Sequence, residues 1–218
     1  PCFVLLKNKK KLWWLNLLIK KEIVKKYSID AKQEAILELF LKKLREYNLH
    51  TNLVGKSTLK NPWVSHILDS LQILPHLKSK DLHILDMGTG AGFPGAVLSI
   101  AGYKNVTLVD SNGKKINFLK LTKKELLLSF NVILGRIESL SNFKYDVITT
   151  RALASLDNLF SYSQRFIKKN TVMVFLKGKT VNDEIEEAQK KWNFYFSKSQ
   201  SISHSDGSVL LIKNLKKK

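Results

Sequence analysis

Hydrophobic and polar positions alternate with a helical period in the first third of the chain. Within residues 33–47, apolar side chains recur every three or four positions, with charged residues between them, at Ile36, Leu37, Phe40, Leu41, Leu44 and Tyr47. Residues 63–74 repeat this spacing and stop before Pro75. Apolar residues at this spacing share one face of an amphipathic helix. We therefore expect a helical cap over residues 31–80.

From Leu82 onward the pattern changes to short apolar runs that alternate with helical stretches. The runs lie at 83–87, 106–110, 132–135, 145–150 and 171–178, and the helical stretches at 94–101, 113–129, 155–168 and 182–192. This alternation predicts a parallel, doubly wound sheet. Two further strands, 194–202 and 209–214, are separated by polar residues and Gly207 and predict a closing antiparallel hairpin. The prediction is an α/β fold over residues 81–218.

Residues 1–30 form a basic extension that we expect to be poorly ordered. Its longest apolar block, residues 12–19, includes Asn16 and is shorter than the roughly 20 residues that a bilayer span requires. Trp13 and Trp14 leave open a basic amphipathic segment that lies on a membrane surface. Neither a membrane span nor a signal peptide is expected.

The net charge and the cysteine content indicate which class of binding partner and which cellular compartment to expect. The 218 residues include 37 Lys and Arg against 18 Asp and Glu, which gives a net charge of +19. A field of this size favours a polyanionic partner such as nucleic acid, although a general lysine bias would give the same total. The single cysteine, Cys2, permits neither an intrachain disulfide nor a thiolate metal cluster. We expect a cytoplasmic monomer without a metal.

The stretch ILDMGTGAGFPG, residues 84–95, matches two cofactor-binding patterns. Read from Gly90 it fits the G-x-G-x-x-G pattern of dinucleotide-binding proteins, and read from Asp86 it fits the D-x-G-x-G-x-G pattern of S-adenosylmethionine-dependent methyltransferases. Either loop brings backbone N–H groups to a ligand at a helix N-terminus. Asp110 ends the next predicted strand, where an acid binds ribose hydroxyls in both classes. These residues alone leave both cofactors open.

Other features favour S-adenosylmethionine over NAD. Asp86 would repel a pyrophosphate, but it can anchor the loop and reach the cationic methionine end of S-adenosylmethionine. The nucleotide-binding unit begins about 80 residues into the chain and is followed by strands for one sheet only. A second nucleotide-binding half is therefore missing. The closing hairpin is common in methyltransferase sheets, and the net charge suits a nucleic-acid substrate.

Short segments across residues 34–214 carry a more specific signal. They are YNL (47–49), NLVGKSTL (52–59), HILDS (66–70), DMGTGAGFPG (86–95), VDSNGKKINFL (109–119), GRIESL (135–140), DVITTRALASL (146–156), LKG (176–178) and DEIEEA (183–188). In this order and at these separations they resemble the RsmG (GidB) family of 16S rRNA guanine-N7 methyltransferases. The resemblance implies a Rossmann-like methyltransferase sheet of seven strands with an N-terminal helical extension. It also implies 16S rRNA, or a precursor of the small ribosomal subunit, as partner.

The resemblance implies roles for single residues as well. Asp110 would hold the ribose, Ile137 and Glu138 would border the adenine, and the loop glycines would permit close approach. Arg151 would face both the cofactor and the incoming guanine. With the loop anchor included, the expected S-adenosylmethionine site comprises Asp86, Gly88, Gly90, Gly92, Phe93, Asp110, Ile137, Glu138 and Arg151.

The chemistry expected at the target is methylation of guanine N7 without a general base. The segment TTRALAS, residues 149–155, replaces the acid or amide and the prolines with which amino-group methyltransferases orient an exocyclic nitrogen. Cys2 lies far from the predicted sheet, which argues against a cysteine nucleophile. The N7 lone pair is free in the neutral base. Catalysis can therefore rest on positioning, with Arg151 holding cofactor and guanine in line.

Three further residues are candidates for contact with RNA, namely His66, Arg136 and Lys177. The pattern favours a plain helix-packing pair for His66 and Asp69, and Arg136 can equally be a surface charge. Lys177 ends the fifth predicted strand beside the cleft. Two rival functions stay open, an NAD-dependent oxidoreductase and a non-catalytic RNA-binding or ribosome-assembly protein of the same fold.

Overall fold

The computed structural model describes residues 16–218, so Cys2, Trp13 and Trp14 lie outside the described residues. Residues 16–26 are helical, and Ile23 and Ile29 are buried in the core. The basic extension from residue 16 onward is therefore part of the fold, contrary to the poor order expected for it. Its apolar side chains pack on the cap, while Lys20 on the same helix pairs with acids of the next helix. Among residues 16–218, no helix is long and apolar enough to cross a membrane.

The expected helical cap is present and is dominated by one long helix, α2 (Ala31–Thr51). Asp30 caps this helix by accepting from the Gln33 N–H, and the Gln33 side chain accepts from the Asp30 N–H in return. The predicted apolar face of α2 is buried. The remaining cap elements are short, namely η1 (Lys56–Lys60), η2 (Trp63–Leu68), α3 (Asp69–Leu71) and η3 (Leu74–His76).

The second predicted cap helix, residues 63–74, differs from a regular α-helix. It begins as a π-helical turn, η2, and continues into the short α3. The Asp69 N–H, which an α-helix would direct to the Ser65 carbonyl, donates instead to the carbonyls of Val64 and His66. The Ser65 carbonyl accepts a hydrogen bond of 3.0 Å from Arg151 Nη1. Turns of this kind are frequent at functional sites, and this one faces the end of a central strand.

The seven strands form a single sheet in the order β3-β2-β1-β4-β5-β7-β6. The first five strands pair in parallel, and β7 runs antiparallel to both β5 and β6. The closing hairpin and the α/β fold class are thereby confirmed. The strands are β1 (His83–Met87), β2 (Asn105–Asp110), β3 (Asn131–Leu134), β4 (Val147–Arg151), β5 (Val172–Lys177), β6 (Trp192–Gln200) and β7 (Ser208–Lys217).

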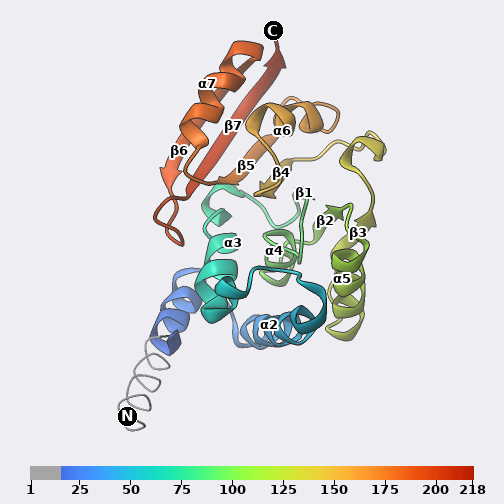
Figure 1. Ribbon diagram of the computed structural model, residues 1–218, viewed down its shortest axis with the longest axis vertical. Coiled ribbons are helices and arrows are strands. Elements are labelled where there is room, and N and C mark those ends of the chain that lie inside the picture. Colours follow the sequence, from blue (N-terminus) through green and yellow to red (C-terminus); the bar gives the residue numbers. More distant parts are fainter. Residues whose placement is uncertain (1–15) are drawn as a thin grey trace.

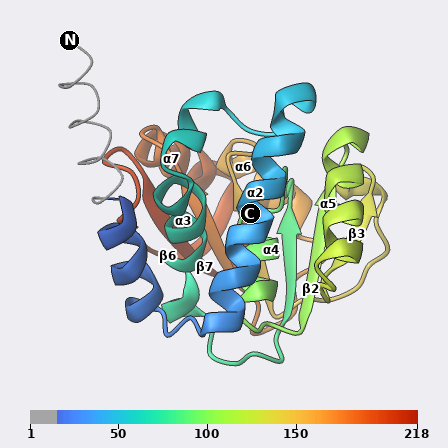
Figure 2. The same ribbon diagram turned by 90° about the horizontal axis from the view of Figure 1, so that it is seen from below.

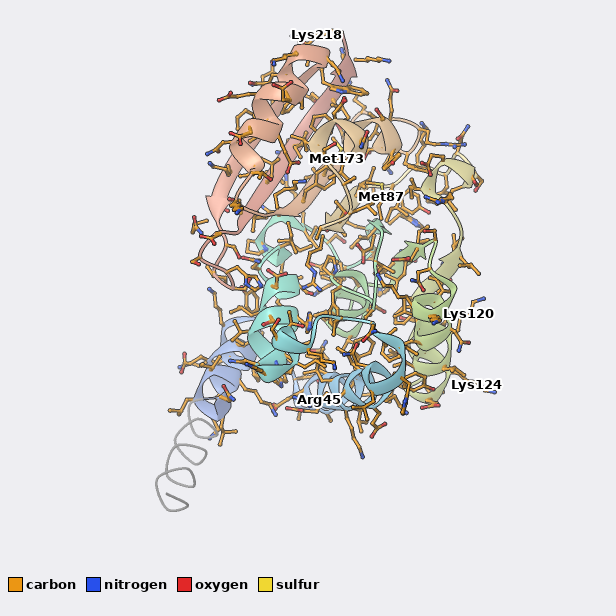
Figure 3. All side chains as sticks on the ribbon, viewed as in Figure 1. Arg45, Met87, Lys120, Lys124, Met173 and Lys218 are labelled. Atoms are coloured by element: carbon orange, nitrogen blue, oxygen red, sulfur yellow. The ribbon has the colours of Figure 1, made fainter. Side chains whose placement is uncertain are left out.

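Helices cover both faces of this sheet. One face is covered by α2, α4 (Gly95–Ile100) and α5 (Gly113–Glu125), and the other by α6 (Leu156–Ser163) and α7 (Val181–Lys191), as Figures 1 and 2 show. Met87 and Met173 are buried on the α6 side, whereas Lys120 and Lys124 project outward from α5 (Figure 3). The cap shares one hydrophobic core with α4, α5 and the sheet. The two predicted regions, 31–80 and 81–218, are therefore packed as one unit.

Candidate active site

Asp86 fixes the glycine loop between β1 and α4 from beneath. Its side chain is fully buried, and Oδ2 accepts hydrogen bonds from Thr89 Oγ1 at 2.5 Å and from the Gly95 N–H at 2.8 Å. Burial raises the pKa of Asp86 to about 7. The expected anchoring role therefore agrees with the geometry. The expected contact with the methionine end of the cofactor does not, because the carboxylate lies under the loop and lines none of the cavities described below.

The loop glycines divide into two groups. A Cβ on Gly90 would meet nothing closer than 3.9 Å, and Gly90 lines an open cleft with φ at +60°. A Cβ on Gly95 would lie 2.0 Å from Leu108, and one on Gly92 would lie 2.8 Å from Leu119. The missing side chain at Gly90 therefore leaves room for a ligand. At Gly92 and Gly95 it instead allows neighbouring side chains of the protein to pack closely against the loop. This corrects the expectation that Gly92 permits approach of the cofactor.

Asp110 lies at the end of β2, beside the loop. Its Oδ2 accepts from the Gly90 N–H and its Oδ1 from the Asn112 N–H, each at 2.8 Å. A carboxylate oxygen can accept more than one hydrogen bond, so both oxygens can still accept from hydroxyl groups. Asp110 lines both of the cavities that meet at the loop, which is where a ribose acid has to lie.

These two cavities form the predicted cofactor cleft. The smaller, of about 90 Å³, has Ile137, Glu138 and Arg136 in its wall. The larger, of about 500 Å³, lies between the glycine loop and Arg151. Arg136, a candidate for RNA contact, thus belongs to the same wall as the residues expected around the adenine. The predicted cofactor residues that line one or both cavities are Gly88, Gly90, Phe93, Asp110, Ile137, Glu138 and Arg151.

Arg151 ends β4 and is held by the cap. Its Nη1 donates to the Ser65 carbonyl and to Asp69 Oδ2, each at 3.0 Å, and its Nη2 lies 3.2 Å from His66 Nδ1. The guanidinium carbon lies 5.1 Å from the centroid of the Phe93 ring. The Arg151 side chain is 23% exposed and that of Asp69 is 7% exposed. A partly buried pair with these additional donors and acceptors holds the guanidinium in one orientation.

His66 is a neutral acceptor toward Arg151. Burial, followed by the Arg151 charge, lowers the pKa of His66 to about 3. Because the guanidinium can only donate, Nδ1 accepts and the ring proton lies on Nε2. Nε2 lies 2.9 Å from Thr58 Oγ1, which itself donates to the Gly55 carbonyl. Both ring nitrogens are thus engaged, and the ring stacks on Phe93 with centroids 4.4 Å apart. The histidine supports the arginine and has no free lone pair.

A third cavity, of about 480 Å³, lies on the other side of Arg151. It shares Thr58, His66, Arg151 and Ala152 with the larger cofactor cavity, and its far wall is the turn between β6 and β7. Lys177 also lines it, but with its side chain only 6% exposed and its Nζ bound to Glu184 and to the Ala154 carbonyl. This corrects the expectation of an RNA contact, because the lysine fastens the loop after β4 to α7.

Sequence reasoning missed the residues that connect this turn to the cap. Ser203 Oγ donates to Asp69 Oδ1, and Gln72 accepts from the Ile202 N–H at 3.0 Å. Gln72 Nε2 in turn donates to Asp69 Oδ1 at 2.8 Å. The HILDS segment pointed to Asp69, but no local pattern pointed to Ser203, which lies 134 positions away from it.

The fold and the site together define a class. The sheet order, the glycine loop after β1 and the acid that ends β2 are those of a Rossmann-like S-adenosylmethionine-dependent methyltransferase. Solved structures of other proteins share the fold. One is the ribosomal protein L11 methylase from Lactobacillus delbrueckii subsp. bulgaricus, with a TM-score of 0.57 and 17% sequence identity. The match covers 74% of this chain and 80% of the methylase chain. Another is the glycopeptide N-methyltransferase MtfA complexed with S-adenosyl-L-methionine, with a TM-score of 0.58 and 6% sequence identity. This match covers 67% of this chain and 93% of the MtfA chain.

Within this class, the chain belongs to the rRNA small subunit methyltransferase G (GidB) family, whose model matches residues 33–212. The ribosomal RNA small subunit methyltransferase G of Rickettsia prowazekii (strain Madrid E) is 39% identical over 181 residues, which are 83% of this chain and 94% of that protein. Its counterpart in Rickettsia akari (strain Hartford) is 36% identical over 191 residues, which are 87% and 99%. The resemblance noted from the motifs is confirmed.

S-adenosylmethionine fits the residues at this cleft. Gly90 leaves an open space where any side chain would intrude, and Asp110 can accept from ribose hydroxyls beside it. Ile137 gives the smaller cavity an apolar wall suited to a purine ring. Phe93 and Arg151 border the larger cavity, where the methionine part of the cofactor would lie.

Proposed function

We propose that the protein transfers a methyl group from S-adenosylmethionine to N7 of a specific guanine in small-subunit (16S) ribosomal RNA. When bound, S-adenosylmethionine supplies an electrophilic methyl group on a sulfonium sulfur. The observation that carries the proposal is the position of Arg151 between the cofactor cleft and a second cavity that is large enough for a base. The printed names of the relatives, ribosomal RNA small subunit methyltransferases, support the substrate class.

The engagement of the two titratable side chains that contact Arg151, those of His66 and Asp69, supports N7 as the target atom. His66 has both ring nitrogens occupied, and Asp69 is bound to Arg151, Gln72 and Ser203. Methylation of an amino group or of a ribose hydroxyl needs a proton acceptor, whereas N7 of a neutral guanine already carries the lone pair that forms the new bond. Positioning by Arg151 then accounts for the catalysis.

The charge of the protein supports an RNA substrate. The net charge is +19, and Lys115 and Arg136 lie in the walls of the cofactor cleft. We expect binding to rRNA to weaken steeply with salt as counterions are released from the phosphates. A ribosomal substrate supports a cytoplasmic location.

Transfer of labelled methyl from S-adenosylmethionine to purified small-subunit rRNA tests the proposal. We expect label that maps, by cleavage at 7-methylguanine, to one guanine. Label on exocyclic nitrogens only would contradict N7 as the target, and binding without any transfer would favour the non-catalytic alternative. Parallel titration with S-adenosylmethionine and NAD separates the methyltransferase from an oxidoreductase.

A further inference from the structure

We propose that the turn between β6 and β7 recognises the Watson–Crick edge of the target guanine through the carboxylate of Asp206, while Arg151 donates to guanine O6. This inference rests on the proposed function and explains how guanine is distinguished from the other bases. It assigns the third cavity as the target-base pocket and Asp206 as the residue that determines specificity.

The pocket has the size and the position that a target base requires. Its volume of about 480 Å³ falls within the roughly 300–1,000 Å³ typical of small-molecule sites. His66 and Arg151 separate it from the cofactor cleft, and both of these residues line the two cavities. An extruded base in this pocket therefore presents one edge toward the cofactor cleft and the opposite edge toward the turn.

Asp206 is the carboxylate that remains available in the wall of this pocket. Asp69 also lines it but is bound to Arg151, Gln72 and Ser203. Asp206 is exposed at the turn and makes no hydrogen bond or ion pair with any of residues 16–218. Guanine is the base whose Watson–Crick edge offers two adjacent donors, N1–H and the N2 amino group. A carboxylate accepts from both at once.

Arg151 supplies the complementary contact at the other end of the base. Both Nη1 hydrogens and one Nη2 hydrogen are used by Ser65, Asp69 and His66. The Nε hydrogen and the second Nη2 hydrogen have no acceptor within residues 16–218. One of them can donate to O6, which is next to N7, and leave the N7 lone pair free for the methyl group. Adenine carries an amino group at that position. An Arg151 N–H donor would then meet a second donor, and no hydrogen bond could form.

The two recognition elements are held in register by one residue. Asp69 binds Arg151 through Oδ2 and Ser203 of the turn through Oδ1. Ser203 lies three positions before Asp206, and both His204 of the turn and His66 line the pocket with Arg151, so the turn lies close to the Arg151 cluster. A pre-organised pair of donor and acceptor groups discriminates between bases more strongly than a flexible one.

The test compares guanosine with inosine, which lacks only the N2 amino group. The guanine that the enzyme methylates is first mapped, and that position is then replaced by inosine in a ligated small-subunit rRNA. For the unmodified enzyme we expect kcat/KM to fall about ten- to a hundredfold on inosine, the value of one hydrogen bond to a charged group. In Asp206→Ala the two substrates should differ less than about threefold, because the acceptor is lost.

Two controls make the result specific. Asp183→Asn, an exposed acid at the start of α7 outside the pocket, should keep the guanosine preference of the unmodified enzyme. Asp206→Ala should bind S-adenosylmethionine with unchanged affinity, which shows that it is folded. A guanosine preference that survives in Asp206→Ala, or that is missing from the unmodified enzyme, would overturn the inference. Failure of the unmodified enzyme to methylate any rRNA would overturn the proposed function instead.

Discussion

The two sides of the active site are built in different ways. The glycine loop is held by residues close to it in the fold's first βαβ unit, namely Asp86, Thr89 and Asp110, whose contacts all lie within that unit. The Arg151 cluster is held by side chains from the cap and from the last hairpin, 82 and more positions away from their partners. The first side binds a cofactor that many proteins share. The second has to recognise a single base, and it is built from contacts between segments far apart in the sequence.

Substitution of Arg151 should distinguish the role of the glycine loop from that of the Arg151 cluster most clearly. In Arg151→Ala we expect methyl transfer to rRNA to fall at least about a hundredfold, because positioning is lost, while S-adenosylmethionine affinity falls much less. Arg151→Lys should recover little activity, since an ammonium group cannot reproduce the planar contacts with Ser65, Asp69 and His66. Labelled methyl transfer and calorimetric titration of the cofactor measure the two effects. Equal losses of transfer and of cofactor affinity would contradict this division of roles.

Two glycine substitutions compare packing with ligand access inside the loop. Gly95→Ala places a Cβ against Leu108 and Asp86 and should lower the free energy of unfolding by about 3 kcal/mol through overpacking. Gly90→Ala meets open space but has φ at +60°, so it should cost about 1 kcal/mol and weaken S-adenosylmethionine binding. Denaturant unfolding and cofactor titration measure both. A Gly90→Ala protein that binds the cofactor normally would contradict the role of Gly90 in the cleft.

Asp69 tests whether the cap positions Arg151. Asp69→Asn leaves a neutral acceptor, and we expect kcat to fall about tenfold, equivalent to one charge-assisted hydrogen bond, with the S-adenosylmethionine Kd unchanged. Asp81→Asn removes an exposed ion pair with Lys104 and should change neither value. An Asp69→Asn protein with normal kcat would show that Arg151 holds its orientation without the cap.

The pH dependence of stability gives the smallest expected effect. His66 has a folded pKa of about 3, below its unfolded value, so its contribution to stability is lost as pH falls below 6.5. Asp86 has a folded pKa of about 7, above its unfolded value, so its contribution grows as pH falls from 7 toward 4. The two contributions largely cancel. In His66→Asn we expect stability relative to the unmodified protein to rise by about 1 kcal/mol between pH 6.5 and 5.5.

Chemical denaturation at the two pH values measures this difference. Asp86→Asn should show the opposite trend and lose stability on acidification relative to the unmodified protein, because the His66 contribution then stands alone. Parallel curves for all three proteins would contradict the pKa assignments.

The part of the site that the sequence predicts is the part that local contacts build. The strand and helix alternation, the glycine loop and Asp110 all follow from patterns shorter than 30 residues, and the structure places them as expected. The local pattern around Lys177 does not reveal that this side chain is buried, because its partner Glu184 lies on the next helix. The role of Gly92 depends on Phe40 and Leu119, which come from two other helices. Contacts between segments that are far apart in the sequence produce no local pattern from which they could be predicted.

The hydrogen bond from Ser203 to Asp69 means that the active site is completed only late in the synthesis of the chain. The cofactor loop and Arg151 are complete once β4 has emerged, but the carboxylate that holds Arg151 gains its second partner only from the turn before the final strand. A chain that ends before Ser203 would contain the glycine loop but lose the far wall of the pocket beside Arg151 and also β7, the strand that joins β6 to β5. A stop codon before Ser203 should therefore abolish recognition of the base, although every residue of the cofactor loop is still translated.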